Sequence, residues 1–126
     1  GGTSVQHLLL GALELAIKEQ KSTDKGRQTL TIEKVVELLS HNPAILFKIN
    51  KRGFIREGYY ADLVLVDPNK EQTINNNDVH YKCGWTAYEG MKLSCSVTHT
   101  FVNGELVYEN GKFKEDYRGK RLTFNR

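Results

Sequence analysis

The stretch Lys51–Asn69, "KRGFIREGYYADLVLVDPN", marks a change of pattern along the chain. Before it, apolar residues recur every three or four positions, as they do on helices. Within it they alternate, and the alternation predicts a strand over residues 60–67. Gly53 and Gly58 precede this strand, and glycine adopts backbone conformations that other residues avoid. We therefore predict that the two glycines bracket a turn, and that a β-rich part of the chain begins here.

The residues before this stretch are predicted to be helical. Ser4 is a candidate cap for a helix over residues 5–20, and the polar segment that follows it is expected to be an exposed loop. Thr31 is predicted to cap a second helix. Asn42-Pro43 is predicted to begin a third, with asparagine as the cap and proline at the first helical position, where its missing N–H costs nothing.

The residues after it are predicted to form further strands, over 71–74, 94–102 and 105–109. Asn103-Gly104 is the strongest hairpin signal in the sequence, and Asn110-Gly111 is a second turn. Leucines and valines alternate over residues 63–66, which favours a strand covered on both faces. Helices followed by strands indicate an α+β fold, with one part over residues 1–50 and a β-rich part over 51–126.

Composition narrows the class of protein. The chain has 126 residues, enough for one domain, with 39% hydrophobic and 26% charged residues. Its 18 basic and 15 acidic residues are interleaved, which argues against nucleic acid as a partner. No run of 18 apolar residues and no signal peptide is visible, so we expect a cytoplasmic protein without a membrane partner. Because the sequence begins "GGTSVQH", we expect it to be a piece of a longer polypeptide.

Asp62, at the start of the predicted strand, has two interpretations. It could be a metal ligand or a general base. It could instead accept hydrogen bonds from backbone N–H groups of a neighbouring turn, as short carboxylates often do. No histidine lies close to it in the sequence. We therefore favour the structural interpretation.

Two histidines and two cysteines offer a second candidate site. His80 and Cys83, followed by Cys95 and His99, have spacings that resemble a zinc site, so a non-enzymatic zinc-binding module is one alternative. However, residues four apart on a strand are roughly 13 Å apart, too far for two ligands of one ion. A buried unpaired cysteine or a disulfide between the two cysteines are the other options. His41 is interpreted as a loop or capping residue rather than a base.

Three stretches occur in the order found at the C-terminal end of amidohydrolase-superfamily enzymes. They are "SVQHLLLGALE", "HNPAILFKINKRGFIREGYYADLVLVDPN" and "THTFVNGELVYENGKF". The superfamily pattern comprises Asn42-Pro43-Ala44, Arg52–Gly58, and Ala61–Val64 followed by Asp67. The flanking "SVQH", "YKCGW" and "VTHTFVNGELVY" more narrowly resemble the dihydroorotase family, particularly its bacterial group.

This resemblance implies a parent enzyme with a metal-dependent (β/α)8 barrel, of which this chain would supply the terminal helices followed by a flanking β-sandwich-type segment. The family interconverts the small molecules N-carbamoyl-L-aspartate and dihydroorotate in pyrimidine biosynthesis, with zinc polarising the carbonyl and activating water. The family's metal ligands and base lie upstream, so no catalytic residue and no metal ligand is expected in this chain, which alone should be inactive. The expected partner is the remainder of the barrel, with a homo-oligomer possible.

Gly1, Gly2 and Thr3 are the one candidate substrate contact. Two glycines before a helix can offer backbone N–H groups to an anion. In the family this loop contacts the substrate carboxylate partly through main-chain groups, although Thr3 stands where a proline is expected. Allantoinase and dihydropyrimidinase, which also hydrolyse cyclic amides, remain alternatives. We also expect the first helix to expose apolar surface and to favour self-association.

Overall fold

The computed structural model of the chain describes residues 6–21, 30–80, 82–114 and 116–125. The chain forms two compact units that are interleaved in sequence. Unit 1 comprises Gly1–Val35 and Asp67–Ser96, and unit 2 comprises Val36–Val66 and Val97–Arg126. The expected division into residues 1–50 and 51–126 stays a prediction. None of the helices in the described ranges is long and apolar enough to cross a membrane.

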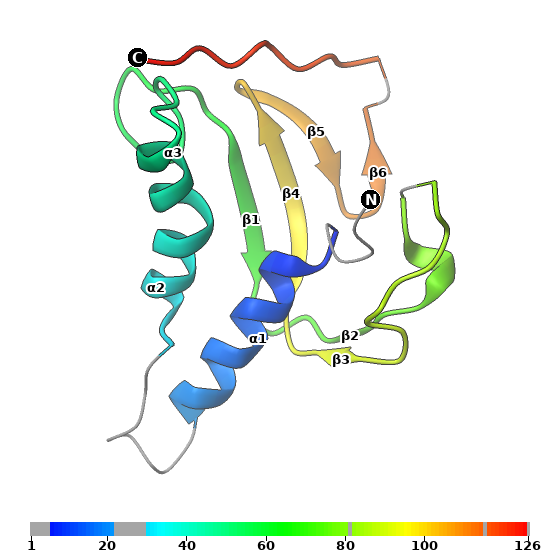
Figure 1. Cartoon of the computed structure of the whole chain (residues 1–126). Coiled ribbons are helices and arrows are strands. Elements are labelled where there is room, and N and C mark those ends of the chain that lie inside the picture. The colour runs from blue at the N-terminus through cyan, green and yellow to red at the C-terminus, as the bar shows by residue number, and fades with distance from the viewer. Residues whose placement is uncertain (1–5, 22–29, 81, 115, 126) are drawn as a thin grey trace. The chain divides into compact units, whose positions relative to one another are not determined.

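Unit 1 is built on helix α1 (Leu8–Lys21), which contacts strand β3 (Lys92–Leu93). Strand β2 (Gln72–Thr73) pairs with β3 in antiparallel register, and the 3-10 helix η3 (Asn76–Asp78) follows β2 (Figure 1). The helical periodicity predicted for this segment is confirmed, since its inward side chains are buried. The buried apolar residues of unit 1 include Leu10, Leu13, Ala16, Ile17, Ile74 and Leu93.

One buried carboxylate fixes α1 to the rest of unit 1. Glu14 is 6% exposed, and its carboxylate accepts hydrogen bonds from the Ser94 backbone N–H at 2.7 Å and from the Ser94 hydroxyl at 3.0 Å. Lys18, one helical turn later, lies 3.8 Å from the same carboxylate. A buried charge requires such partners. This side chain therefore determines where the helix lies along the β3 segment.

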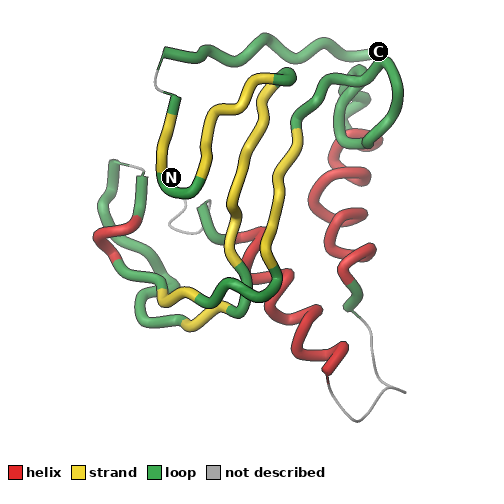
Figure 2. Tube along the Cα trace, turned by 180° about the vertical axis from the view of Figure 1, so that it is seen from behind, coloured by secondary structure: helices red, strands yellow, loops and turns green. Residues whose placement is uncertain are grey.

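Unit 2 contains most of a four-stranded sheet in the order β1-β4-β5-β6, whose strands lie side by side (Figure 2). Strands β4 (Ser96–Val102), β5 (Glu105–Glu109) and β6 (Lys112–Phe113) form successive hairpins. Both predicted turns are confirmed: φ is +50° and +82° at Asn103 and Gly104, and +45° and +92° at Asn110 and Gly111. Two consecutive positive φ values are typical of the type I′ turn, which suits strand twist.

Strand β1 (Leu63–Asp67) lies at the edge of this sheet and runs opposite to β4 (Figure 1). The prediction that it is covered on both faces is wrong for this chain. Val64 is 41% exposed and Leu65 is 50% exposed, although they point to opposite faces. Covering both faces requires a layer on each side of the strand, and the described residues do not supply both layers.

The helical segment before β1 consists of α2 (Ile32–Val36), the π-helix η2 (Glu37–His41) and α3 (Asn42–Leu46). The predicted cap at Thr31 is confirmed, because its hydroxyl accepts the Lys34 N–H at 3.0 Å. The predicted cap at Asn42 is wrong. Asn42 has helical angles, φ −63° and ψ −43°, and its N–H donates to the carbonyl of Glu37, five residues earlier.

Pro43 explains this π-helical turn. Proline has no N–H, and in a regular α-helix its ring clashes with the carbonyl four residues earlier. A π-turn widens the backbone locally, and such single turns occur within α-helices. The helix therefore continues past Pro43 and ends at Leu46, after which Lys48 has φ +54° and the Ile49 N–H donates to the Ala44 carbonyl at 2.9 Å.

Candidate functional site

The N-terminal end of α1 was the expected substrate contact, but Gly1, Gly2 and Thr3, like the predicted cap Ser4, lie outside the described residues. Gln6, the first described residue, connects this end of α1 to the end of η3 and the residues that follow it. Its side-chain amide donates to the Asp78 carbonyl at 3.0 Å, and its side-chain oxygen accepts the His80 N–H at 2.8 Å. One side chain thus replaces a pair of backbone hydrogen bonds.

His7, next to Gln6, is buried with 4% of its surface exposed. Its Nδ1 has no hydrogen-bond partner within the described part of the chain, and its ring meets that of Tyr88 edge-on with centroids 6.2 Å apart. Burial lowers the pKa of His7, Asp78 raises it to a lesser extent, and His80 lowers it further. Burial and His80 therefore favour the neutral imidazole. Sequence reasoning missed this residue, and the available signal was a polar pair directly before an apolar helix.

Asp62 is held by two partners that come from distant parts of unit 2. Its Oδ1 accepts the backbone N–H of Asn103 at 2.8 Å, and its Oδ2 pairs with the guanidinium of Arg52. The same guanidinium donates to the Asn103 side-chain oxygen at 3.0 Å and lies 4.1 Å from the centroid of the Tyr60 ring. One carboxylate oxygen therefore binds the hairpin turn, and the other binds the arginine. This arrangement supports the structural interpretation over a metal ligand or a base.

The two glycines of the deciding stretch form the predicted turn. Gly53 and Gly58 have φ of +85° and +82°. The Tyr60 N–H donates to the Lys51 carbonyl at 3.0 Å, and this hydrogen bond closes the loop that contains both glycines. A Cβ added at Gly53 would lie 2.5 Å from the Ala44 Cβ and 2.7 Å from the Ser40 carbonyl oxygen. Gly53 is thus needed for close packing against the helical segment as well as for its backbone angles.

The histidines and cysteines do not form a metal site among the described residues, where no group of three His, Cys, Asp or Glu side chains could hold an ion. Both cysteines are free thiols, so the disulfide alternative is wrong. Cys83 is exposed, whereas Cys95 is fully buried, and burial, followed by the nearby Glu14 charge, raises its pKa. His99 lies 3.6 Å from the Glu109 carboxylate on the neighbouring strand.

His41 ends η2 and is the N-cap position of α3, but its side chain makes no capping hydrogen bond, so the loop alternative is wrong and the cap holds in position alone. Its ring stacks on that of Phe54, with centroids 4.2 Å apart and an angle of 5° between the planes. Arg56 lies over Phe54, 4.1 Å from the ring centroid. His41 therefore packs the helical segment against the 51–60 loop, which is a structural role.

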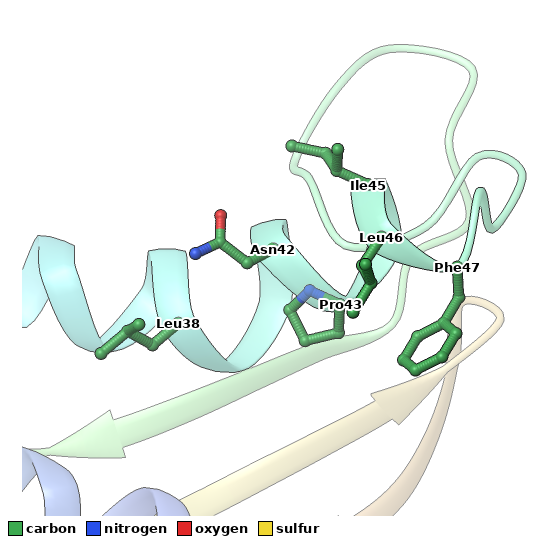
Figure 3. A pocket seen from close by; sticks show the side chains of 6 residues that line it. All are labelled: Leu38, Asn42, Pro43, Ile45, Leu46 and Phe47. Carbon is green, nitrogen blue, oxygen red and sulfur yellow. The ribbon is translucent and has the colours of Figure 1, made fainter.

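An open groove of about 480 Å³ lies along the end of the helical segment (Figure 3). Its lining is almost entirely apolar, and all of it comes from η2, α3 and the residue that follows. The residues are Leu38, Asn42, Pro43, Ile45, Leu46 and Phe47. Without a charged side chain or a convergent set of polar groups, this groove has the character of a packing surface rather than of a catalytic centre.

Comparison with known proteins places the chain in a family. A model of the amidohydrolase family matches residues 2–107. The chain belongs to the amidohydrolase family. The resemblance expected from Asn42-Pro43-Ala44 and Ala61–Val64 is therefore confirmed at the level of the superfamily.

Two curated amidohydrolases illustrate the range of relatives. The dihydroorotase of Pyrococcus horikoshii is 41% identical over 94 residues, which are 75% of this chain and 22% of that protein. The allantoinase of Desulfitobacterium hafniense strain Y51 is 33% identical over 123 residues, 97% of this chain and 26% of that protein. The chain thus spans only about a quarter or less of these relatives. The expected bacterial subgroup gains no support, because Pyrococcus is archaeal.

Solved structures agree on the family. A D-hydantoinase structure shares 28% identity with a TM-score of 0.63, over 80% of this chain and 21% of that one. The dihydropyrimidinase from Brevibacillus agri shares 24% identity with a TM-score of 0.72, over 84% of this chain and 22% of that one, which supports the fold alone. The predicted α+β class is confirmed, and the described elements do not close a barrel.

Amidohydrolases generally use a metal ion, typically zinc. The residues present here do not fit that role, because the described part of the chain has no cluster of three metal-ligating side chains. Asp62, the carboxylate considered above as a metal ligand, already accepts hydrogen bonds from Arg52 and from the Asn103 N–H. We therefore derive no catalytic step from the residues of this chain.

Proposed function

We propose that this chain is the C-terminal portion of a dihydroorotase, a cytoplasmic zinc amidohydrolase that interconverts N-carbamoyl-L-aspartate and dihydroorotate. The zinc and the catalytic base belong to the remainder of the enzyme. The chain itself contributes helix α1, whose N-terminal end carries the Gly1–Thr3 loop that would contact the substrate carboxylate. Its other parts serve the architecture of the enzyme.

The observation that carries the choice of dihydroorotase is sequence identity. Dihydroorotases of Pyrococcus horikoshii and Pyrococcus abyssi are each 41% identical to this chain, whereas the allantoinases of Rubrobacter xylanophilus and Desulfitobacterium hafniense are 39% and 33% identical. The buried side chains near α1 are compatible with a supporting role. Gln6, three residues after Thr3, is anchored to the Asp78 carbonyl and the His80 N–H, and rigid support of this kind favours a well-defined contact nearby.

Allantoinase is the second candidate, and one observation favours it. The allantoinase match extends over 97% of the chain, whereas the Pyrococcus horikoshii match extends over 75%. Both enzymes hydrolyse a C–N bond of a cyclic amide. The residues that distinguish their substrates would lie in the remainder of the polypeptide.

The test is an assay of the natural polypeptide that carries this chain, purified with zinc from its source. We expect ring opening of dihydroorotate and ring closure of N-carbamoyl-L-aspartate, with no turnover of allantoin or hydantoin. The 126-residue chain alone, with the same zinc, should be inactive. Turnover of allantoin without dihydroorotate would establish the second candidate, and turnover by the isolated chain would refute the assignment of catalysis to the remainder.

A further inference from the structure

Two asparagine-glycine turns join β4 to β5 and β5 to β6, and their backbones are nearly the same (Figure 1). At Asn103-Gly104 φ is +50° and +82°, and at Asn110-Gly111 it is +45° and +92°. The backbone N–H of each asparagine is also held at 2.8 Å, the first by the Asp62 carboxylate and the second by the Thr98 carbonyl. The local backbone therefore does not distinguish the two turns, whereas the asparagine side chains do.

The carboxamide of Asn103 is held at both ends. Its oxygen accepts a hydrogen bond from the Arg52 guanidinium at 3.0 Å, and its nitrogen donates to the Tyr117 hydroxyl at 3.1 Å. Asn110 is exposed, and its carboxamide makes no hydrogen bond among the residues that the structure describes. It also lies in a turn whose second strand, β6, has only two residues. Segments with few buried contacts open locally at little cost in free energy.

A free asparagine side chain before glycine can react with the backbone of its own chain. The Gly111 nitrogen, which no Cβ shields, attacks Cγ of Asn110. The N–Cγ bond forms, the Cγ–Nδ2 bond breaks, and the side-chain nitrogen leaves as ammonia with the proton of the Gly111 N–H. Water then opens the five-membered succinimide ring, giving aspartate by addition at Cγ and isoaspartate by addition at the backbone carbonyl carbon. Because the reacting atoms belong to adjacent residues, the first step is intramolecular and water is the only co-reactant of the second.

We propose that Asn110 is a site of spontaneous deamidation and that the fold protects Asn103 from the same reaction. This inference does not depend on which ring the enzyme opens. Asn103 has to release a hydrogen bond with a charged donor before the Gly104 nitrogen can attack its Cγ, and such a bond is worth about a factor of ten in an equilibrium constant. We therefore expect deamidation of Asn110 to be roughly tenfold faster than that of Asn103.

The products would change this edge of the sheet in two ways. Both products add a carboxylate beside Glu109, whose own carboxylate lies 3.6 Å from His99. Isoaspartate also lengthens the backbone between β5 and β6 by one carbon atom. The extra atom disturbs the pairing of Tyr108 with Phe113, whose ring centroids lie 4.9 Å apart. We therefore expect the modification to loosen β6 from the sheet.

Peptide mass spectrometry of the natural polypeptide, after incubation in mildly alkaline buffer, tests the proposal. Cleavage after glutamate separates the two asparagines, because Glu105 and Glu109 lie between them, and fragmentation distinguishes isoaspartate from aspartate. We expect products at Asn110 to accumulate roughly tenfold faster than at Asn103 in the folded protein, and at similar rates at both sites in guanidinium chloride. Equal rates in the folded protein, faster reaction at Asn103, or no product at Asn110 would overturn the proposal.

Two variants test the protection and the site separately. Tyr117→Phe removes the hydroxyl that accepts the Asn103 side-chain nitrogen, so it should speed deamidation of Asn103 several-fold and leave Asn110 unchanged. An unchanged rate at Asn103 would contradict the protection. Asn110→Gly tolerates the positive φ and lacks the reacting amide. After the same incubation, the Lys114 N–H, which donates to the Val107 carbonyl at 2.8 Å, should exchange with solvent faster in the original protein and at its initial rate in Asn110→Gly. Equal exchange in both would refute the loosening of β6.

Discussion

Removing the Asp62 carboxylate should destabilise unit 2 without creating or abolishing any metal site. The Arg52 side chain is only 10% exposed, so the change Asp62→Ala leaves a nearly buried guanidinium without its carboxylate. It also removes the acceptor of the Asn103 N–H in the hairpin turn. Arg52 keeps two other contacts, with the Asn103 side chain and the Tyr60 ring.

The size of the effect follows from the exposure of both partners. Breaking a fully buried ion pair costs about 3–5 kcal/mol, but Asp62 is 35% exposed and solvent screens part of that interaction. Loss of a hydrogen bond to a charged acceptor costs about 1.5 kcal/mol or more. We therefore expect the free energy of unfolding to fall by about 2 kcal/mol, with Asp62→Asn falling by less because its oxygen can still accept the Asn103 N–H.

Urea unfolding of the isolated chain measures this change as a lower midpoint at constant slope. Asp67→Ala is the matched control. Asp67 lies at the other end of the same strand, and its carboxylate accepts only the Asn69 N–H among the hydrogen bonds described here, in an exposed turn. Its loss should cost less than about 1 kcal/mol. When Asp62→Ala is combined with Arg52→Met, the loss of unfolding free energy should be smaller than the sum of the losses of the two single variants. A loss under about 0.5 kcal/mol for Asp62→Ala, or strict additivity with Arg52→Met, would refute the reasoning.

Three further predictions concern packing, protonation and thiol reactivity. Gly53→Ala should lower the free energy of unfolding in urea by about 3 kcal/mol, because φ is +85° and the added methyl meets the helical segment. Gly58→Ala, at φ +82° in open space, should lower it by only about 1 kcal/mol. Equal losses would contradict the close-packing argument. Burial lowers the pKa of His7 below its ordinary 6.5, so the unfolded chain binds the proton more readily. The melting temperature should therefore fall as pH drops below about 6.5, and His7→Gln should reduce that fall; an unchanged pH profile would exclude His7 as its source. Cys83 should react with a thiol reagent in the folded chain, and Cys95 only after unfolding, because Cys95 is buried and its pKa is raised. Rapid labelling of both cysteines in the folded chain would contradict the burial of Cys95 in unit 1.

Local chemistry predicted well those features that depend on a few neighbouring residues. Thr31 caps its helix and Asn103-Gly104 forms its turn, because caps and two-residue hairpins are determined within four residues. The cap at Asn42 failed for an instructive reason. The rule for Asn-Pro assumes that proline begins a helix, and a π-turn allowed the preceding helix to continue past Pro43 instead.

The arrangement around Asp62 could not have been predicted in full, because its members are far apart in sequence. Asn103 lies 41 residues after Asp62 and 51 after Arg52. Only the fold brings the hairpin turn to the start of β1, and no periodicity encodes that distance. The same holds for Gln6, whose two partners lie more than 70 residues away. The sequence indicated that Asp62 was structural, whereas the structure identified what it supports.

The stretch that marks the family therefore does so through architecture. Gly53 permits the close approach of the 51–60 loop to the helical segment, and Asp62 holds the hairpin turn through one oxygen and Arg52 through the other. Both roles concern the packing of the chain and are independent of the ring that the enzyme opens. That is why the stretch places the chain in the family but does not distinguish a dihydroorotase from an allantoinase.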